Sequence, residues 1–318
     1  MTAPLKFGFI PSEGPRRFRE AIEEVRRAEE LGFDSVWIQE RHLIADNFWS
    51  SPLVAASGFL AATSRIIVGT DILVFPFYHA VRLAEDIATL DILSGGRFVF
   101  GTAIGYKPDE FALYGTAQEG RGKRFEEGLK LMKRLWTEDE HFEPKPLTKP
   151  HPPLWIGGWG PLQIKRAALL GDAWLPGVSV DLPALLERKK ELLRHRAEAG
   201  LSAPTEWPLT REVVIAKTSK EAREHAEQYL MPFYRKVYAG QWRHQFITPE
   251  VASSGERLAK DRFIIGDPAE VIAGMRRFAE AYGATHLICR LFTAGVPHGE
   301  IMRSLTLLAE EVMPAFRA

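Results

Sequence analysis

Three polar residues that could do acid–base chemistry follow an apolar run near the N-terminus. The run covers residues 35–38, and after Gln39 the chain continues with Glu40, Arg41 and His42. Histidine titrates near neutral pH, and a neighbouring carboxylate can hold one tautomer and tune its pKa. We expect Glu40 and His42 to face a pocket, although a surface loop with an ion pair fits the same residues. No metal is expected, because only these two could be ligands and no matching pair is evident elsewhere.

A carboxylate interrupts a later apolar run. Asp71 lies in the middle of residues 66–74, which are otherwise dominated by Ile, Val, Leu and Gly. A buried carboxylate must be hydrogen-bonded or neutralised, because its burial otherwise costs several kcal/mol. We expect either a polar edge of a ligand or a backbone N–H to satisfy Asp71.

A loop with glycines and polar residues follows the run at residues 98–101. Gly105 would let a planar ligand approach the backbone closely. Tyr106 could donate a proton or stack on a ligand. Asp109 could accept a hydrogen bond from a ring N–H, or it could begin a helix, where acidic residues are favoured. The helix start is the preferred interpretation for Glu110.

A glycine-rich turn at residues 157–160 precedes a predicted helix at 162–170. The turn consists of Gly157, Gly158, Trp159 and Gly160. Free N–H groups at such a helix start can hold an anion, so the turn is a candidate phosphate site. It is neither a Walker loop nor a dinucleotide fingerprint, because the residues that complete those motifs are missing. Arg121 and Arg124 could reach the same phosphate, or they could begin a solvated helix.

Strands and helices alternate along almost the whole chain. Eight short apolar runs predict buried strands, at residues 7–10, 35–38, 66–74, 98–101, 154–156, 173–175, 213–216 and 286–291. Apolar residues at helical spacing lie between them, and the first such helix should stop at Gly32. Eight strands with helices between them favour an α/β fold with a closed (β/α)8 TIM barrel. An open doubly wound sheet is the alternative.

We expect one domain over residues 1–318. Residues 240–267, between the last two predicted strands, form a long irregular stretch, which favours a lid or insertion over the C-terminal mouth. Polar groups after parallel strands meet at that end of a barrel, where ligands bind.

The composition limits the partners of the protein. Basic and acidic residues both total 41, so nothing attracts the 318-residue chain broadly to nucleic acid or to a membrane. Cys289 is the only cysteine and lies in an apolar run, so we expect a buried small hydrophobe. The chain has neither a leader peptide pattern nor an apolar run that could span a bilayer, and the cytoplasm is the expected location.

Five segments together resemble the luciferase-like family of flavin and F420-dependent oxidoreductases and monooxygenases. They are residues 28–42, 66–115, 121–136, 154–177 and 264–291. The resemblance implies a (β/α)8 barrel with an insertion over its mouth, and reduced FMN or F420 as cofactor. It implies a non-prolyl cis peptide within Thr70, Asp71 and Ile72, and a phosphate site at residues 157–160.

The chain departs from the family pattern at several positions. Arg41 stands where many members have a histidine, and Ile104 where bacterial luciferase has a phosphate-binding arginine. Tyr106 stands where F420-dependent sugar-phosphate dehydrogenases have a glutamate that acts as an acid. Trp159 and Gly160 replace a serine that is frequent in FMN-dependent members, which favours F420.

The resemblance and the residues together predict an oxidoreductase that acts on a small organic substrate. Arg41 and His42 would stabilise an anionic ring or peroxide oxygen, and Tyr106 would position the substrate or donate a proton. The expected cofactor contacts are Glu40, Thr70, Asp71, Ile72, Gly105, Asp109, Arg121, Gly157, Gly158, Trp159 and Gly160. A homodimer and a separate flavin or F420 reductase are expected partners. The alternatives are a flavin-binding protein without turnover and a metal-dependent hydrolase.

Overall fold

The computed structural model describes residues 4–44, 48–242, 244–293 and 295–317. The strands are β1 (Lys6–Ile10), β2 (Ser35–Ile38), β3 (Ile67–Thr70), β4 (Leu73–Val74), β5 (Phe98–Ala103), β6 (Leu154–Gly157), β7 (Ala173–Leu175), β8 (Pro208–Ile215), β9 (Ile264–Gly266) and β10 (His286–Arg290). The α-helices are α1 (Phe18–Glu30), α2 (Pro52–Ala62), α3 (Ala80–Ser94), α4 (Pro108–Leu113), α5 (Arg121–Thr137), α6 (Pro161–Leu170), α7 (Leu182–Glu198), α8 (Ser219–His225), α9 (Met231–Phe233), α10 (Pro249–Ala252), α11 (Gly255–Ala259), α12 (Pro268–Tyr282), α13 (His298–Leu307) and α14 (Pro314–Arg317).

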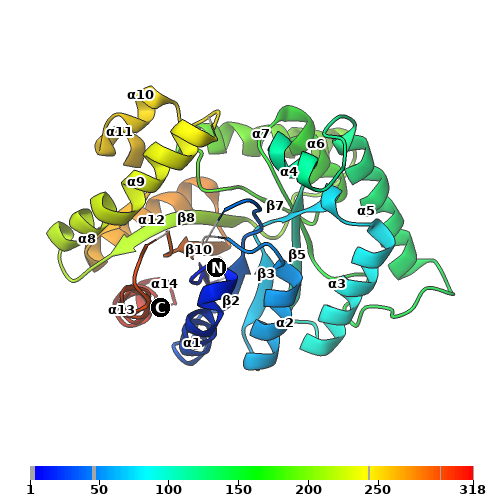
Figure 1. Cartoon of the computed structure of the whole chain (residues 1–318), viewed down its shortest axis with the longest axis horizontal. Coiled ribbons are helices and arrows are strands. Elements are labelled where there is room, and N and C mark those ends of the chain that lie inside the picture. Colours follow the sequence, from blue (N-terminus) through cyan, green and yellow to red (C-terminus); the bar gives the residue numbers. More distant parts are fainter. Residues whose placement is uncertain (1–3, 45–47, 243, 294, 318) are drawn as a thin grey trace.

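The strands form one curled, parallel sheet. Their order is β7-β6-β5-β3-β2-β1-β10-β8-β9, with β4 also paired to β5. Figure 1 shows the strands in the interior, with helices such as α1, α2 and α3 outside them. Cα atoms of β7, at one end of this order, lie within 8 Å of Cα atoms of β8, near the other end, so the curl brings the two ends of the sheet close together. Because β10 returns to lie beside β1, the order differs from an open doubly wound sheet.

All eight predicted strands are present, but the third, predicted at residues 66–74, is divided into β3 and β4. The seventh, β8, is longer than expected, because it begins at Pro208 and not at residue 213. The short strand β9 was not predicted. The first helix, α1, ends at Glu30, and Gly32 has a φ of 87°, as the predicted stop requires. None of the helices in the described ranges is both long and apolar enough to cross a membrane.

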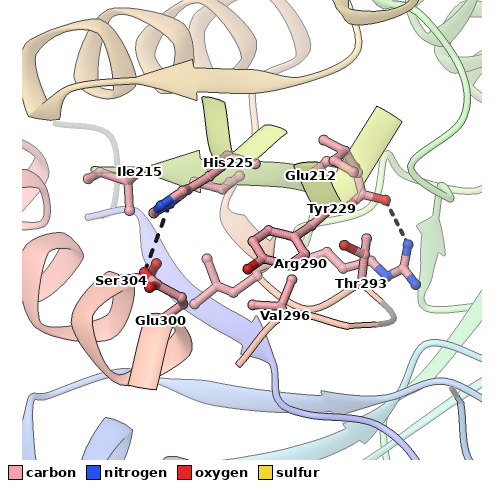
Figure 2. A pocket seen from close by; sticks show the side chains of 13 residues that line it. Glu212, Ile215, His225, Tyr229, Arg290, Thr293, Val296, Glu300 and Ser304 are labelled. Atoms are coloured by element: carbon pink, nitrogen blue, oxygen red, sulfur yellow. Dashed lines mark hydrogen bonds and ion pairs between the residues drawn. The ribbon is translucent and has the colours of Figure 1, made fainter. Parts of the chain in front are cut away.

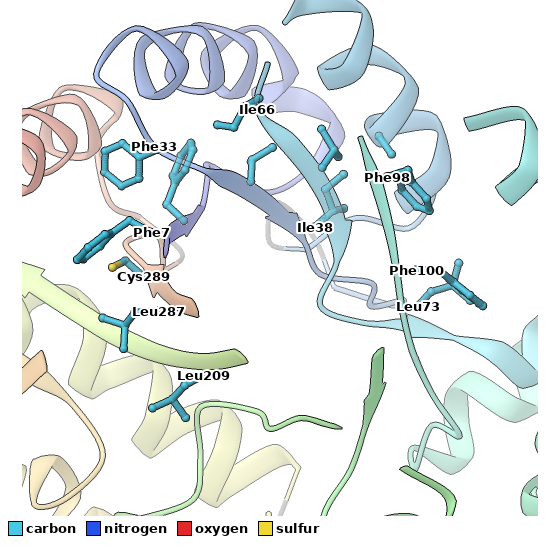
Figure 3. Close-up of a cluster of buried hydrophobic side chains, with 14 of the residues drawn as sticks. Phe7, Phe33, Ile38, Ile66, Leu73, Phe98, Phe100, Leu209, Leu287 and Cys289 are labelled. Atoms are coloured by element: carbon cyan, nitrogen blue, oxygen red, sulfur yellow. The ribbon is translucent and has the colours of Figure 1, made fainter. Parts of the chain in front are cut away.

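Alternation along the strands separates two apolar layers. On β1, Phe7 and Phe9 belong to the large core cluster that the helices cover, whereas Ile10 belongs to a separate cluster inside the curl. This follows from the two-residue period of a strand, which places successive side chains on opposite faces. Figure 3 shows part of the large cluster, including Phe33 and Cys289. Cys289 is fully buried, as expected.

Two tryptophans pack the interior of the curl. The rings of Trp37 and Trp155 stack with their centroids 4.8 Å apart, and Trp37 donates a hydrogen bond to the hydroxyl of Ser35 at 2.8 Å. Gly69 makes room for them, because a Cβ there would lie only 2.3 Å from the Trp37 ring. These rings fill part of the interior as a packed core.

The connection between β8 and β9 is largely helical. Helix α8 continues through π-helical turns at Ala226–Leu230 and Tyr234–Gln241, with α9 between them, and α10 and α11 follow. The expectation of an irregular stretch at 240–267 is therefore wrong in this respect, since that stretch contains α10, α11 and β9. Tyr234, Tyr238 and Phe263 belong to a hydrophobic cluster separate from the main core, which this segment shares with Phe48 and Val178 from other loops.

Candidate functional site

A cavity of about 780 Å³ opens among the loops that follow the strands. Its volume lies within the usual range for small-molecule sites, about 300–1,000 Å³. The expected site residues that line it are Glu40, Arg41, Asp71, Ile72, Gly105, Tyr106, Arg121, Gly157, Gly158, Trp159 and Gly160. His42, Thr70 and Asp109 are not among its lining residues. The expected residues that line the cavity thus come from five segments far apart in the sequence.

The glycine turn after β6 forms one part of the wall. Gly158 has a φ of 121°, and a Cβ there would lie 2.3 Å from Cγ of Gln163. Gln163 donates a hydrogen bond from its amide to the carbonyl of Gly157 at 3.0 Å, which fixes the turn. Within the described chain, no backbone acceptor is found for the N–H groups of Trp159 and Gly160. The turn therefore offers free donors at the start of α6, which suits a phosphate group.

Arg166 adds a cation beside this turn. Its guanidinium fits because position 122 is glycine: a Cβ on Gly122 would lie 2.4 Å from Nη2 of Arg166. Nε of Arg166 pairs with Glu126 at 2.7 Å, and Nη1 lies 3.4 Å from the amide oxygen of Gln163. Both Gly122 and Arg166 line the cavity. The combination of free N–H groups and a nearby arginine is the usual chemistry of a phosphate site.

The two arginines predicted for the phosphate behave differently. Arg121 lines the cavity and donates a hydrogen bond to the carbonyl of Gly105 at 3.2 Å. Arg124 instead donates to the carbonyls of Ala117 and Glu119 in the preceding loop, and it does not line the cavity. Of the two alternatives for Arg124, the structure favours the helix start, because its guanidinium lies outside the cavity and is held by carbonyls of the preceding loop.

Asp71 and Ile72 lie on the wall where β3 ends. The peptide bond between them is cis, which confirms the predicted cis bond and fixes its position. Oδ2 of Asp71 accepts a hydrogen bond from the hydroxyl of Thr210 at 2.8 Å, and burial raises the pKa of Asp71 to about 7. Its partner is thus a hydroxyl rather than the expected backbone N–H. The Thr70 hydroxyl instead bridges to the backbone of Gly101, so it joins two strands and does not face the cavity.

Glu40 lines the cavity, whereas His42 lies behind it. Glu40 accepts hydrogen bonds from the backbone N–H of Val74, from the Tyr78 hydroxyl at 2.8 Å and from Nε2 of His42 at 3.0 Å. Burial raises the pKa of Glu40. Nδ1 of His42 lies 3.2 Å from the hydroxyl of Tyr114, so both ring nitrogens are occupied. The expectation that His42 faces the pocket is therefore wrong, because protein partners enclose its ring.

Asp109 also lies away from the cavity. Its carboxylate accepts a hydrogen bond from the N–H of Glu110 at 3.0 Å, and it lies 3.6 Å from Nζ of Lys107. Asp109 therefore lies in the first turn of a helix, the second of its two predicted roles, since α4 begins at Pro108. Glu110 is buried instead of solvated, and it accepts a hydrogen bond from the backbone N–H of His42 at 3.2 Å. The structure thus places Asp109 in the helix start and outside the cavity lining, and its expected cofactor contact stays a prediction.

Arg41 and Tyr106 meet on the cavity wall. Nη2 of Arg41 donates a hydrogen bond to the Tyr106 hydroxyl at 3.1 Å. Nη1 of Arg41 lies 3.7 Å from Oε2 of Glu110, and the guanidinium carbon lies 4.5 Å from the centroid of the Trp242 ring. Because the Tyr106 oxygen already accepts from Arg41, its own proton can be donated to a ligand.

The segment after β8 contributes a neutral histidine. His244 lines the cavity, and its Nδ1 accepts a hydrogen bond from the N–H of Phe246 at 3.3 Å. Its Nε2 lies 3.3 Å from the hydroxyl of Ser179, so the proton belongs on Nε2. Burial, helped by the charge of Arg41, lowers the pKa of His244 to about 4. The imidazole is therefore neutral at physiological pH.

A second, much smaller space of about 30 Å³ lies between β8, β10 and α13 (Figure 2). An ion pair of 2.7 Å joins Arg290 and Glu212 on its wall, and His225 lies 3.9 Å from Glu300. The space would hold one water molecule and is too small for a cofactor. Across the described residues, no group of three or more His, Cys, Asp or Glu is arranged to bind a metal ion.

Comparison with known proteins identifies the family. The model of the luciferase-like monooxygenase family matches residues 3–286. The chain belongs to the luciferase-like monooxygenases. One relative in this family is an F420-dependent glucose-6-phosphate dehydrogenase of Amycolatopsis mediterranei, which is 26% identical, with 99% of each chain covered. Another is the oxygenase component of a flavin-dependent trigonelline monooxygenase of Acinetobacter baylyi, 26% identical over 94% of this chain and 90% of the relative.

A solved structure of the same fold is the monooxygenase RslO1 of Streptomyces bottropensis. It superposes with a TM-score of 0.83 at 23% identity, and the match covers 98% of this chain and 100% of the other. Luciferase-like proteins that use F420 and those that use flavin thus both resemble this chain over nearly its whole length.

Sequence reasoning missed several lining residues of this luciferase-like chain. Gln163 and Arg166 were missed although they lie three residues apart on α6, one turn beyond the glycine turn. That spacing puts both on one helix face and was the available signal. Tyr238 and Gln245 carry no comparable signal, because their positions depend on how the segment after β8 folds over the strands.

Proposed function

We propose that this luciferase-like chain is an oxidoreductase that binds a reduced flavin-type cofactor, FMN or F420, and acts on a small organic substrate. The single observation that carries the proposal is the cavity itself. It combines a glycine turn with free N–H groups, three arginines and the apolar side chain of Ile72 at the ends of parallel strands. The relatives that use F420 or flavin support the same conclusion.

The residues present fit such a cofactor. The turn keeps its shape because Gly158 has no Cβ, which would collide with Gln163, and Arg121 and Arg166 would neutralise the charge of a phosphate. Ile72 and Gly105 would support a flat ring, because neither places a polar group against it. When bound, reduced FMN supplies a reaction with oxygen, and F420 supplies hydride transfer.

The polar side chains of the wall would orient the substrate and move protons. Arg41 and the hydroxyl of Tyr106 both lie at the cavity with donor capacity left, so they would hold developing negative charge. His42 would act through Glu40 as a positioning residue, since its ring is bonded to that carboxylate. Trp242 and His244 would exclude water from the bound substrate.

We also propose the finer architecture that the family resemblance implies. The curled sheet would close between β7 and β8 into a full (β/α)8 barrel in one domain, because those strands approach each other. Residues 240–267 would act as a lid, which the position of His244 on the cavity wall supports. A homodimer in the cytoplasm is proposed from the resemblance, and a separate reductase from the relative that is an oxygenase component.

Anaerobic titration of the purified protein with reduced FMN and with F420, followed by absorbance, tests the proposal. We expect one of them to bind with a Kd below about 100 μM, equivalent to about −5.5 kcal/mol. Binding of neither cofactor would remove the basis of the proposal. If one cofactor binds, steady-state oxygen uptake would separate the FMN mechanism from the F420 mechanism, which needs no oxygen. Tight binding with no turnover of any substrate would favour the flavin-binding protein instead.

A further inference from the structure

Three aromatic rings surround one guanidinium on the cavity wall. The guanidinium carbon of Arg41 lies 4.5 Å from the ring centroid of Trp242, 5.0 Å from that of Tyr106 and 5.7 Å from that of Phe48. All four residues line the cavity. The rings come from the loops after β2 and β5 and from the end of the π-helical turn Tyr234–Gln241, so the enclosure exists only in the folded chain. Aromatic faces attract a cation and hold its flat guanidinium in place.

Most of the hydrogen-bonding capacity of Arg41 is unused. A guanidinium carries five N–H donors, yet the hydrogen bond from Nη2 to the Tyr106 hydroxyl is the one found for it among the described residues. Nε is buried without an acceptor, and Nη1 lies 3.7 Å from Glu110, beyond hydrogen-bonding distance. The side chain is only 14% exposed. Buried donors without acceptors are costly, so this arrangement favours a ligand that brings acceptors.

The carboxylate nearest to Arg41 does not satisfy it. Glu110 also lies 3.7 Å from Nζ of Lys107, so its charge is shared between two cations. Two further titratable neighbours, His244 and Tyr238, are neutral at physiological pH. The pKa of His244 is lowered to about 4 by burial and by Arg41, and burial raises the pKa of the Tyr238 hydroxyl. Apart from the pair formed by Glu110 and Lys107, the residues around Arg41 on this part of the wall are therefore aromatic and uncharged.

We propose that the substrate is an anion on a flat apolar body, of the aromatic carboxylate class, and that Arg41 binds its anionic group. The proposal rests on the proposed function, because it assigns the substrate of the same cavity. A carboxylate can accept two parallel hydrogen bonds from a guanidinium, which would use the donors that now lack acceptors. The rings of Trp242, Tyr106 and Phe48 would contact the flat body. Arg41 is then a specificity residue for the substrate, in place of a contact to the cofactor.

Binding of 2-naphthoate and of its neutral analogue 2-naphthamide tests the proposal. Isothermal titration calorimetry would measure both ligands on the unaltered chain, with and without saturating F420 or FMN. We expect 2-naphthoate to bind at least about tenfold more tightly than the amide. Equal affinity for the two ligands would overturn the proposal, and this comparison needs no variant. Failure of the proposed function would show separately, as absence of cofactor binding without naphthoate.

Two variants separate charge from stacking. Arg41→Met should weaken 2-naphthoate at least about tenfold and change 2-naphthamide by less than about twofold, because it removes the cation alone. Trp242→Leu should weaken both ligands. Arg82→Met, which removes an exposed arginine on α3, is the matched control and should change neither. If Arg41→Met weakens cofactor binding while leaving the affinity for 2-naphthoate unchanged, Arg41 serves the cofactor and the proposal is wrong.

Discussion

Replacing Asp71 by Asn should change how stability depends on pH. Asp71 is only 6% exposed, and burial raises its pKa from 3.8 to about 7. A carboxyl whose pKa is higher in the folded than in the unfolded chain prefers to stay protonated in the fold. Its stabilising contribution is therefore fully present below pH 4 and is lost as the pH rises from about 4 to about 7. Each pH unit corresponds to about 1.4 kcal/mol, so the loss amounts to at most about 4 kcal/mol.

Asparagine removes this titration while keeping the shape of the side chain. Its amide oxygen can still accept the hydrogen bond from Thr210. The free energy of unfolding of Asp71→Asn should therefore rise relative to the unaltered chain between pH 4 and pH 7, by up to about 4 kcal/mol, and the difference should be constant above pH 8.

Urea denaturation of both proteins at several pH values between 4.5 and 8.5 measures this difference. Other titrating groups are present in both chains, so their contributions largely cancel. The matched control is Asp109→Asn, which makes the same chemical change at a half-exposed aspartate outside the cavity. If the difference in the free energy of unfolding between Asp71→Asn and the unaltered chain stays constant from pH 4.5 to pH 8.5, the raised pKa of Asp71 is wrong.

Three further outcomes are expected. Gly158→Ala should weaken FMN or F420 binding at least about tenfold in the anaerobic titration, because Gly158 has a φ of 121° and a Cβ there would collide with Gln163. The control Gly200→Ala should leave cofactor binding unchanged, because Gly200 has a φ of 69° and open space around it. Trp37→Ala should lower the free energy of unfolding by about 3–5 kcal/mol in urea, since the ring is fully buried; a loss below about 1 kcal/mol would argue against the packed interior. His244 has a pKa lowered to about 4, so its contribution to stability should fall as the pH drops from about 6.5 to about 4, and His244→Gln should abolish that fall.

The strands were predictable because their signal is local. Runs such as β1 and β2 are apolar on both faces, since one face packs under helices and the other packs inside the curl. The start of β8 gave no such signal, because it contains Arg211 and Glu212. Buried Glu212 has partners far away in the sequence: Arg290 pairs with it at 2.7 Å, and the Tyr234 hydroxyl donates a hydrogen bond to it at 2.8 Å. Pairings of that kind become visible only once the chain is folded.

The site was predictable to the extent that its residues follow strands directly. The glycine turn after β6 and Arg41 after β2 lie on the cavity, as their positions suggested. The side-chain directions were not predictable. His42 turns toward Glu40 and Tyr114, and Arg166 reaches the cavity only because position 122 has no side chain. Both outcomes depend on contacts between distant segments.

A crystal structure of the protein grown with saturating FMN or F420 would show directly whether the cavity is the cofactor site. We expect the cofactor in the cavity, with its phosphate within hydrogen-bonding distance of the N–H groups of Trp159 and Gly160 and of the guanidinium of Arg166. A cofactor bound elsewhere, or a cavity without cofactor at saturating concentrations of both, would contradict this expectation.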